Sequence, residues 1–118
     1  MKKVLPLLLF VLLAFAGCQR GPAIYQVADN PREMANNAEK FAKQTTKRAA
    51  SYTAEEWQVA VDQFVAMVKD YSDKKHYMSQ EDIFRVDAAR LEFIKAVGEH
   101  GNDDLVAQIK EAYSQINN

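Results

Sequence analysis

The last three quarters of the chain are divided into four segments by helix N-cap signatures, and this division favours a helical fold. Residues 30–33 (Asn-Pro-Arg-Glu) supply a capping side chain, a proline at the first helical position and a glutamate at the third. Thr53 and Glu56 have the spacing of a capping box, and residues 79–82 form a third cap. A last helix is expected to start at residues 102–104, where two aspartates complement the helix dipole.

Apolar side chains recur at helical spacing behind each cap. In chain order the four predicted buried faces are Met34, Ala38, Phe41, Thr45 and Ala49; Trp57, Val61, Phe64, Val68 and Tyr71; Phe84, Ala88, Leu91 and Ile94; and Leu105, Ile109, Ala112 and Ile116. Ile83 and Val97 widen the third face. Val86 and Phe93 fall on the opposite side of that segment, which suggests that other parts of the protein cover the third helix on two faces. Trp57 is predicted to pack in the core. The third helix is predicted to end within residues 98–101, where a glycine can adopt the left-handed backbone conformation.

Strand signals are nearly absent, since no stretch alternates β-branched with polar residues and no Asn-Gly or Asp-Gly turn occurs. We therefore expect an all-α fold, a small antiparallel bundle of three long helices plus a shorter C-terminal helix, after a cleaved signal segment. The expected helix lengths are roughly 20, 18, 18 and 15 residues. Tyr71, Tyr77 and Met78 gather at the second turn, where they would cover the end of the core or form an exposed apolar patch.

The first 17 residues have the features of an export signal. Lys2 and Lys3 precede an uncharged apolar run over residues 4–16, which is shorter than the roughly 20 residues of a membrane-spanning helix. The next residues complete Phe15-Ala16-Gly17-Cys18, which resembles the lipobox of bacterial lipoproteins, although leucine is commoner than phenylalanine at its first position. The resemblance implies cleavage by signal peptidase II between Gly17 and Cys18, and acylation of Cys18.

Two alternatives to acylation stay open: an ordinary secretory signal with a chance cysteine, and an uncleaved membrane anchor. On the lipoprotein interpretation the chain has three parts. Residues 1–17 are the signal peptide, residues 18–30 are the acylated cysteine and a tether, and residues 31–118 are the helical bundle domain. The tether assignment rests on Gly21-Pro22 and on the lack of any sustained periodicity before Asn30.

Composition excludes several classes of protein. The formal net charge of −1 argues against a nucleic-acid-binding protein, and a single cysteine excludes an internal disulfide and a cysteine-rich metal site. His100 with Asp103 and Asp104 is a weak metal pattern, and we interpret His76 and His100 as solvent-exposed histidines. No phosphate-binding loop or nucleophile triad is found. The sequence therefore predicts no catalytic residue, no metal ligand, no cofactor and no enzyme activity.

Charge is unevenly distributed, because basic residues outnumber acidic ones in residues 18–52 and the reverse holds in the rest of the chain. The basic residues of the first helix include Lys40, Lys43, Lys47 and Arg48. They either complement neighbouring acidic helices or form a contact face for anionic lipid headgroups or an acidic partner.

The stretch from Ser51 to Trp57 (Ser-Tyr-Thr-Ala-Glu-Glu-Trp), followed by Phe64 and Tyr71, resembles a family of small Bacteroidales lipoproteins. Those proteins carry a helical domain of unknown function that starts with Tyr-Thr-x-Glu-Glu/Asp-Trp. The resemblance covers roughly residues 40–100 and implies a helical envelope lipoprotein, with no functional residue to carry over.

We expect a lipid-anchored cell-envelope protein whose helical domain is non-catalytic and has a structural or protein-binding role. The expected partners are the membrane, through acyl chains on Cys18, and an unidentified envelope protein. The alternative is an envelope inhibitor or immunity-type protein, whose acidic body would suit a basic enzyme or toxin. Gln19 after the cysteine resembles the outer-membrane sorting choice of enterobacteria, so the expected location is the periplasmic face of the outer membrane.

Overall fold

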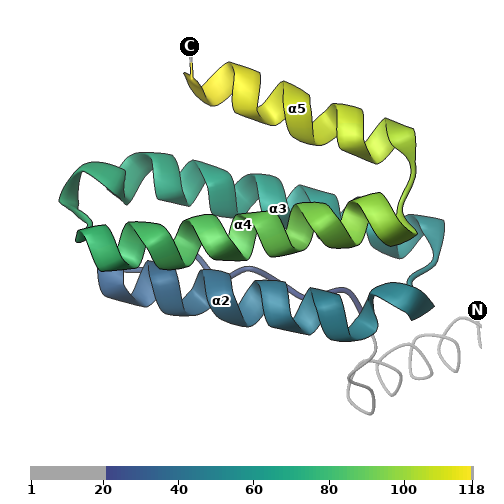
Figure 1. The fold of residues 1–118 in the computed structure, drawn as a ribbon, viewed down its shortest axis with the longest axis horizontal. Coiled ribbons are helices and arrows are strands. Elements are labelled where there is room, and N and C mark those ends of the chain that lie inside the picture. The colour runs from purple at the N-terminus through teal and green to yellow at the C-terminus, as the bar shows by residue number, and fades with distance from the viewer. Residues whose placement is uncertain (1–20, 118) are drawn as a thin grey trace, which may run out of the picture.

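The structure is a computed structural model and describes residues 21–117. Its helices are α2 (Pro31–Arg48), α3 (Ala54–Lys74), α4 (Gln80–His100) and α5 (Asp103–Asn117), with short 3-10 turns at Ala49–Ser51 and Lys75–Tyr77. Consecutive helices run in opposite directions (Figure 1). Among these residues there is no strand, so the predicted all-α bundle of three long helices and a shorter C-terminal helix is confirmed. None of the described helices has the length and hydropathy to cross a membrane.

The predicted N-caps all form. The side chain of Asn30 accepts a hydrogen bond from the Glu33 backbone amide at 2.8 Å. Thr53 and Glu56 make the reciprocal capping box, and the Ser79 hydroxyl accepts from the Asp82 amide at 3.0 Å. Each cap satisfies a backbone amide that has no partner within the helix, which sets where the helix begins.

The closest packing joins α2 to α4, which run in the same direction. Both helices bury small side chains, Ala35, Ala38 and Ala42 on α2 and Ala89 and Ala96 on α4, and small side chains let two backbones approach. A charged contact fixes the pair: the Arg85 guanidinium donates to both carboxylate oxygens of Glu39, at 2.6 and 2.9 Å. This hydrogen bonding lowers the pKa of Glu39 and raises that of Arg85.

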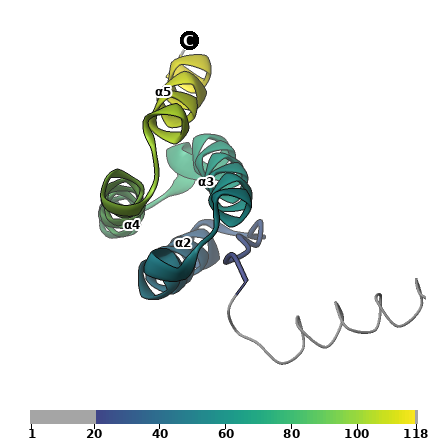
Figure 2. The same cartoon turned by 90° about the vertical axis from the view of Figure 1, so that its right-hand side faces the viewer.

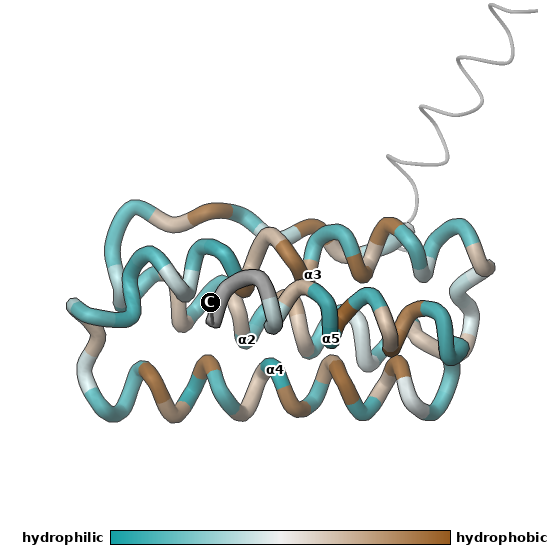
Figure 3. The backbone as a smooth tube through the Cα atoms, turned by 90° about the horizontal axis from the view of Figure 1, so that it is seen from above, coloured by the Kyte–Doolittle hydropathy of each residue, from teal (hydrophilic) through white to brown (hydrophobic). Residues whose placement is uncertain are grey.

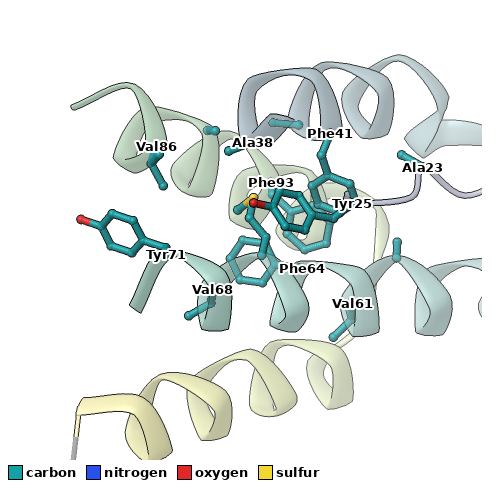
Figure 4. Packing of buried hydrophobic residues seen from close by; sticks show 14 of the residues in the cluster. Ala23, Tyr25, Ala38, Phe41, Val61, Phe64, Val68, Tyr71, Val86 and Phe93 are labelled. Carbon is teal, nitrogen blue, oxygen red and sulfur yellow. The ribbon is translucent and has the colours of Figure 1, made fainter. Parts of the chain in front are cut away.

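Phenylalanine rings from three helices meet in the centre of the bundle (Figure 4). The Phe93 ring of α4 stacks on Phe64 of α3 with centroids 4.4 Å apart, and on Phe41 of α2 at 5.4 Å. Trp57 is 3% exposed and meets Phe93 edge-on at 6.4 Å, so the predicted core role of the tryptophan is confirmed. The predicted buried faces of α2 and α3 are confirmed in full.

The prediction for α4 is wrong about which face enters the core. Phe84 and Leu91 are 75% and 68% exposed, and the buried apolar residues of α4 are instead Val86, Ala89, Phe93 and Ala96. Val97, which is expected to widen the predicted face, is also buried. The two faces have the same heptad-like spacing, so periodicity could not separate them. The core selects the face that carries Phe93, because that ring fills the space between α2 and α3.

The ends of α3 and α4 also differ from what the sequence predicts. The cluster at the second turn divides: Tyr71 and Met78 are buried, whereas Tyr77 is exposed. At the end of α4, Gly101 has φ −92° and is therefore not left-handed, contrary to the prediction. Glycine is needed at position 101 for lack of space, because a Cβ atom there would lie 2.8 Å from the Val97 carbonyl oxygen.

Candidate functional site

The N-terminal part of the described chain is not a free tether. Residues 21–29, here called the strap, lie beside α2 and α3 on the side of the bundle away from α4 (Figure 2). Ala23, Tyr25 and Ala28 are at most 6% exposed and belong to the hydrophobic core. The tether assignment for residues 18–30 is therefore wrong from residue 21 onward, because residues 21–29 are part of the packed domain. The signal peptide, Gly17 and Cys18 lie outside the described residues.

Side chains of α2, α3 and the first turn hold the strap by its backbone. The Tyr25 amide donates to the Gln63 side chain at 2.8 Å, and the Ala23 amide donates to the Tyr52 hydroxyl at 3.2 Å. From α2, Arg48 donates to the Gly21 carbonyl at 2.8 Å. Because the strap has no helix or sheet of its own, these contacts satisfy backbone groups that burial would otherwise leave unpaired.

Asp70 is the buried anchor of the strap. This α3 residue is 4% exposed, and its carboxylate accepts from the Tyr25 hydroxyl at 2.5 Å, from the Ala28 amide at 3.1 Å and from Lys74 one turn along α3. Burial, followed by the bond to Asp70, raises the pKa of Tyr25 well above its usual value, so Tyr25 stays a hydrogen-bond donor. The cluster is fully paired, which is the arrangement of a structural contact.

The predicted basic contact face consists of three exposed lysines and one arginine with a structural role. Lys40, Lys43 and Lys47 are exposed, and none forms an ion pair with another described residue. Arg48 is half-buried and holds Gly21, so it is not a free contact residue. The three remaining lysines are here called the α2 lysines.

Two large apolar side chains of the strap lie exposed next to this basic helix. Ile24 is 59% exposed and Val27 is 69% exposed. Ile24 and Lys40 line the same open hollow of about 280 Å³, together with Gln44 and Arg48. The strap and α2 therefore present apolar and cationic groups on one side of the molecule.

A second hollow of about 270 Å³ lies between α3, α4 and α5. The Arg90 guanidinium is 5.2 Å from the ring centres of both Tyr71 and Tyr113, and it pairs with Asp87 at 3.3 Å. Because Asp87 offsets the arginine charge, this hollow is no strong anion site. His76 also lines this second hollow, whereas His100 ends α4 in an exposed position. Among the described residues, no group of three histidine, cysteine, aspartate or glutamate side chains is close enough together to hold a metal ion.

The strap was missed because its signal is faint in the sequence. Its buried positions, Ala23, Tyr25 and Ala28, are small or isolated, so they make no periodic pattern. Asp70 offers a clearer signal, since it places a carboxylate between Val68 and Tyr71 of the buried α3 face. A buried carboxylate needs donors, and Tyr25 supplies one.

Together these features define an all-α bundle closed on one side by an N-terminal strap. Searches against known protein families, curated proteins and solved structures find no match for this chain.

Proposed function

We propose that this chain is a lipid-anchored cell-envelope protein whose helical domain is non-catalytic and has a structural or protein-binding role. Acylation of Cys18 would attach it to a membrane, and the periplasmic face of the outer membrane is the proposed location. The lipobox and the resemblance of residues 51–57 to Bacteroidales lipoproteins support this proposal from the sequence. The proposed partner, besides the membrane, is an envelope protein.

The single observation that carries the proposal is the position of Gly21. Cys18 precedes Gly21 by three residues, and three extended residues reach about 11 Å at most. Gly21 is bound to the bundle through Arg48. An acyl group on Cys18 would therefore hold the folded domain about a nanometre from the lipid surface, much closer than a 12-residue tether would.

This short connection favours one orientation of the domain on the membrane. The strap side carries exposed Ile24 and Val27, and the α2 lysines lie on the neighbouring helix. Each basic side chain near an anionic surface contributes about 1 kcal/mol of attraction, and exposed aliphatic groups add to it by entering the interface. We propose that this side faces the bilayer, which leaves α4 and α5 available to other proteins.

The proposal predicts that a radiolabelled or clickable palmitate incorporates into the wild-type chain and not into Cys18→Ala. The expected effect is complete loss of label, because the chain has one cysteine. Expression of both chains in a host with lipoprotein processing, followed by gel detection of the label, measures it. Gln19→Ala is the control and should keep the label. Equal labelling of wild type and Cys18→Ala would overturn the lipid anchor.

A further inference from the structure

The exposed face of α4 has a regular pattern of its own. Six exposed residues follow one another at spacings of 3, 4, 3, 4 and 3, which is the heptad spacing of a helix–helix seam. They are Glu81, Phe84, Ala88, Leu91, Lys95 and Gly98, here called the α4 ridge. Phe84 is 75% exposed and Leu91 is 68% exposed. The ridge is thus apolar at its middle, acidic at one end and basic at the other.

No described part of the chain covers the α4 ridge. α4 packs against α2 and α5, and through Phe93 against α3, and the strap lies at the opposite edge of the molecule (Figures 2 and 3). The charges at its two ends are also unpaired, since neither Glu81 nor Lys95 has an ion-pair partner among the described residues. These two residues cannot reach each other within one helix, because 14 residues of α-helix rise about 21 Å.

We propose that the α4 ridge binds the α4 ridge of a second copy of this chain in antiparallel orientation. A twofold axis near Ala88 brings Glu81 of one copy toward Lys95 of the other, at both ends of the seam. A parallel pairing would instead oppose glutamate to glutamate and lysine to lysine. The order of charges therefore selects both the occupant and the direction, since the surface complements itself only when reversed.

The apolar middle of the ridge fits the same arrangement. Reversal about Ala88 places Phe84 and Leu91 of each copy around the small Ala88 side chain of the other, and Gly98 leaves room at the seam end. Small residues between large ones allow close packing of two helices. With one helix from each copy, the buried area lies at or below the 1,200–2,000 Å² typical of stable complexes, so this is a weak dimer. The proposal holds whether or not the chain is lipid-anchored.

A zero-length carbodiimide crosslinker tests the pairing on the full chain in nonionic detergent. The expected product is a covalent dimer in which mass spectrometry finds Lys95 joined to Glu81. Because these residues lie too far apart within one helix, that crosslink reports contact between copies. A chain that stays monomeric at every concentration, or a dimer without this crosslink, overturns the proposal.

Substitutions on the exposed ridge test the same contact without disturbing the core. Leu91→Ser is expected to reduce the crosslinked dimer about tenfold. Val59→Ser is the matched control, because Val59 is 39% exposed and lies on α3, and it should leave the dimer unchanged. Glu81→Lys and Lys95→Glu should each weaken the dimer, and the double exchange should restore it. The antiparallel seam is contradicted if Leu91→Ser forms as much crosslinked dimer as the wild-type chain. It is also contradicted if the double exchange does not restore the dimer.

Discussion

Replacing Phe93 by alanine is expected to lower the free energy of unfolding by about 3–5 kcal/mol. The ring is fully buried and stacks between Phe41 and Phe64, so its loss removes contacts to two other helices and leaves a cavity at the centre of the bundle. Such a loss is a large share of the free energy of unfolding of a domain, which is typically about 5–15 kcal/mol. Urea unfolding followed by far-ultraviolet circular dichroism measures it.

Phe84→Ala is the matched control on the same helix. Its ring is 75% exposed, so we expect a change within about 0.5 kcal/mol. The pair of variants separates the two apolar faces of α4 directly. A large decrease in the free energy of unfolding in Phe84→Ala, together with a small decrease in Phe93→Ala, would mean that α4 is rotated by half a turn about its axis relative to this structure.

Replacing Asp70 by alanine is expected to cost about 3 kcal/mol or more. The Tyr25 hydroxyl and the Ala28 amide would lose their acceptor inside the protein, and each buried donor without a partner costs about 1–3 kcal/mol. Lys74 would also lose its carboxylate partner. The strap should consequently detach, and chymotrypsin should cleave after Tyr25 much faster than in the wild-type chain.

Asp73→Ala is the control for this variant, because Asp73 lies on the same helix and is exposed. We expect its unfolding free energy to stay within about 0.5 kcal/mol of wild type and the cleavage rate at Tyr25 to be unchanged. Slow cleavage at Tyr25 in Asp70→Ala would contradict the role of the carboxylate as the anchor of the strap.

The helices could be predicted from the sequence because their causes are local. The Asn30, Thr53 and Ser79 caps are interactions between residues three positions apart in the sequence. In addition, α2 and α3 each have a single apolar face, so helical periodicity identifies the side that is buried. α4 could not be resolved in the same way. It carries two apolar faces, and the choice between them depends on Phe41 and Phe64, which come from other helices.

The strap depends on contacts between residues that are distant in the sequence. Tyr25 meets Asp70 across 45 positions, and the Gly21 carbonyl meets Arg48 across 27. No local pattern in residues 21–29 reports such contacts, so an irregular segment with glycine and proline resembled a tether. For the candidate site, the α2 lysines could be predicted from their helical spacing, whereas the structural role of Arg48 could not.

The central claim is that an acylated Cys18 holds the strap and α2 against the membrane, and protection of lysines from an amine-reactive label tests it most directly. The acylated chain is labelled in vesicles that contain anionic lipid and again in detergent. We predict that the vesicles protect Lys40, Lys43 and Lys47 several-fold, while exposed Lys69 on α3 and exposed Lys110 on α5 react equally in both. Equal labelling of the α2 lysines in vesicles and detergent would contradict the claim.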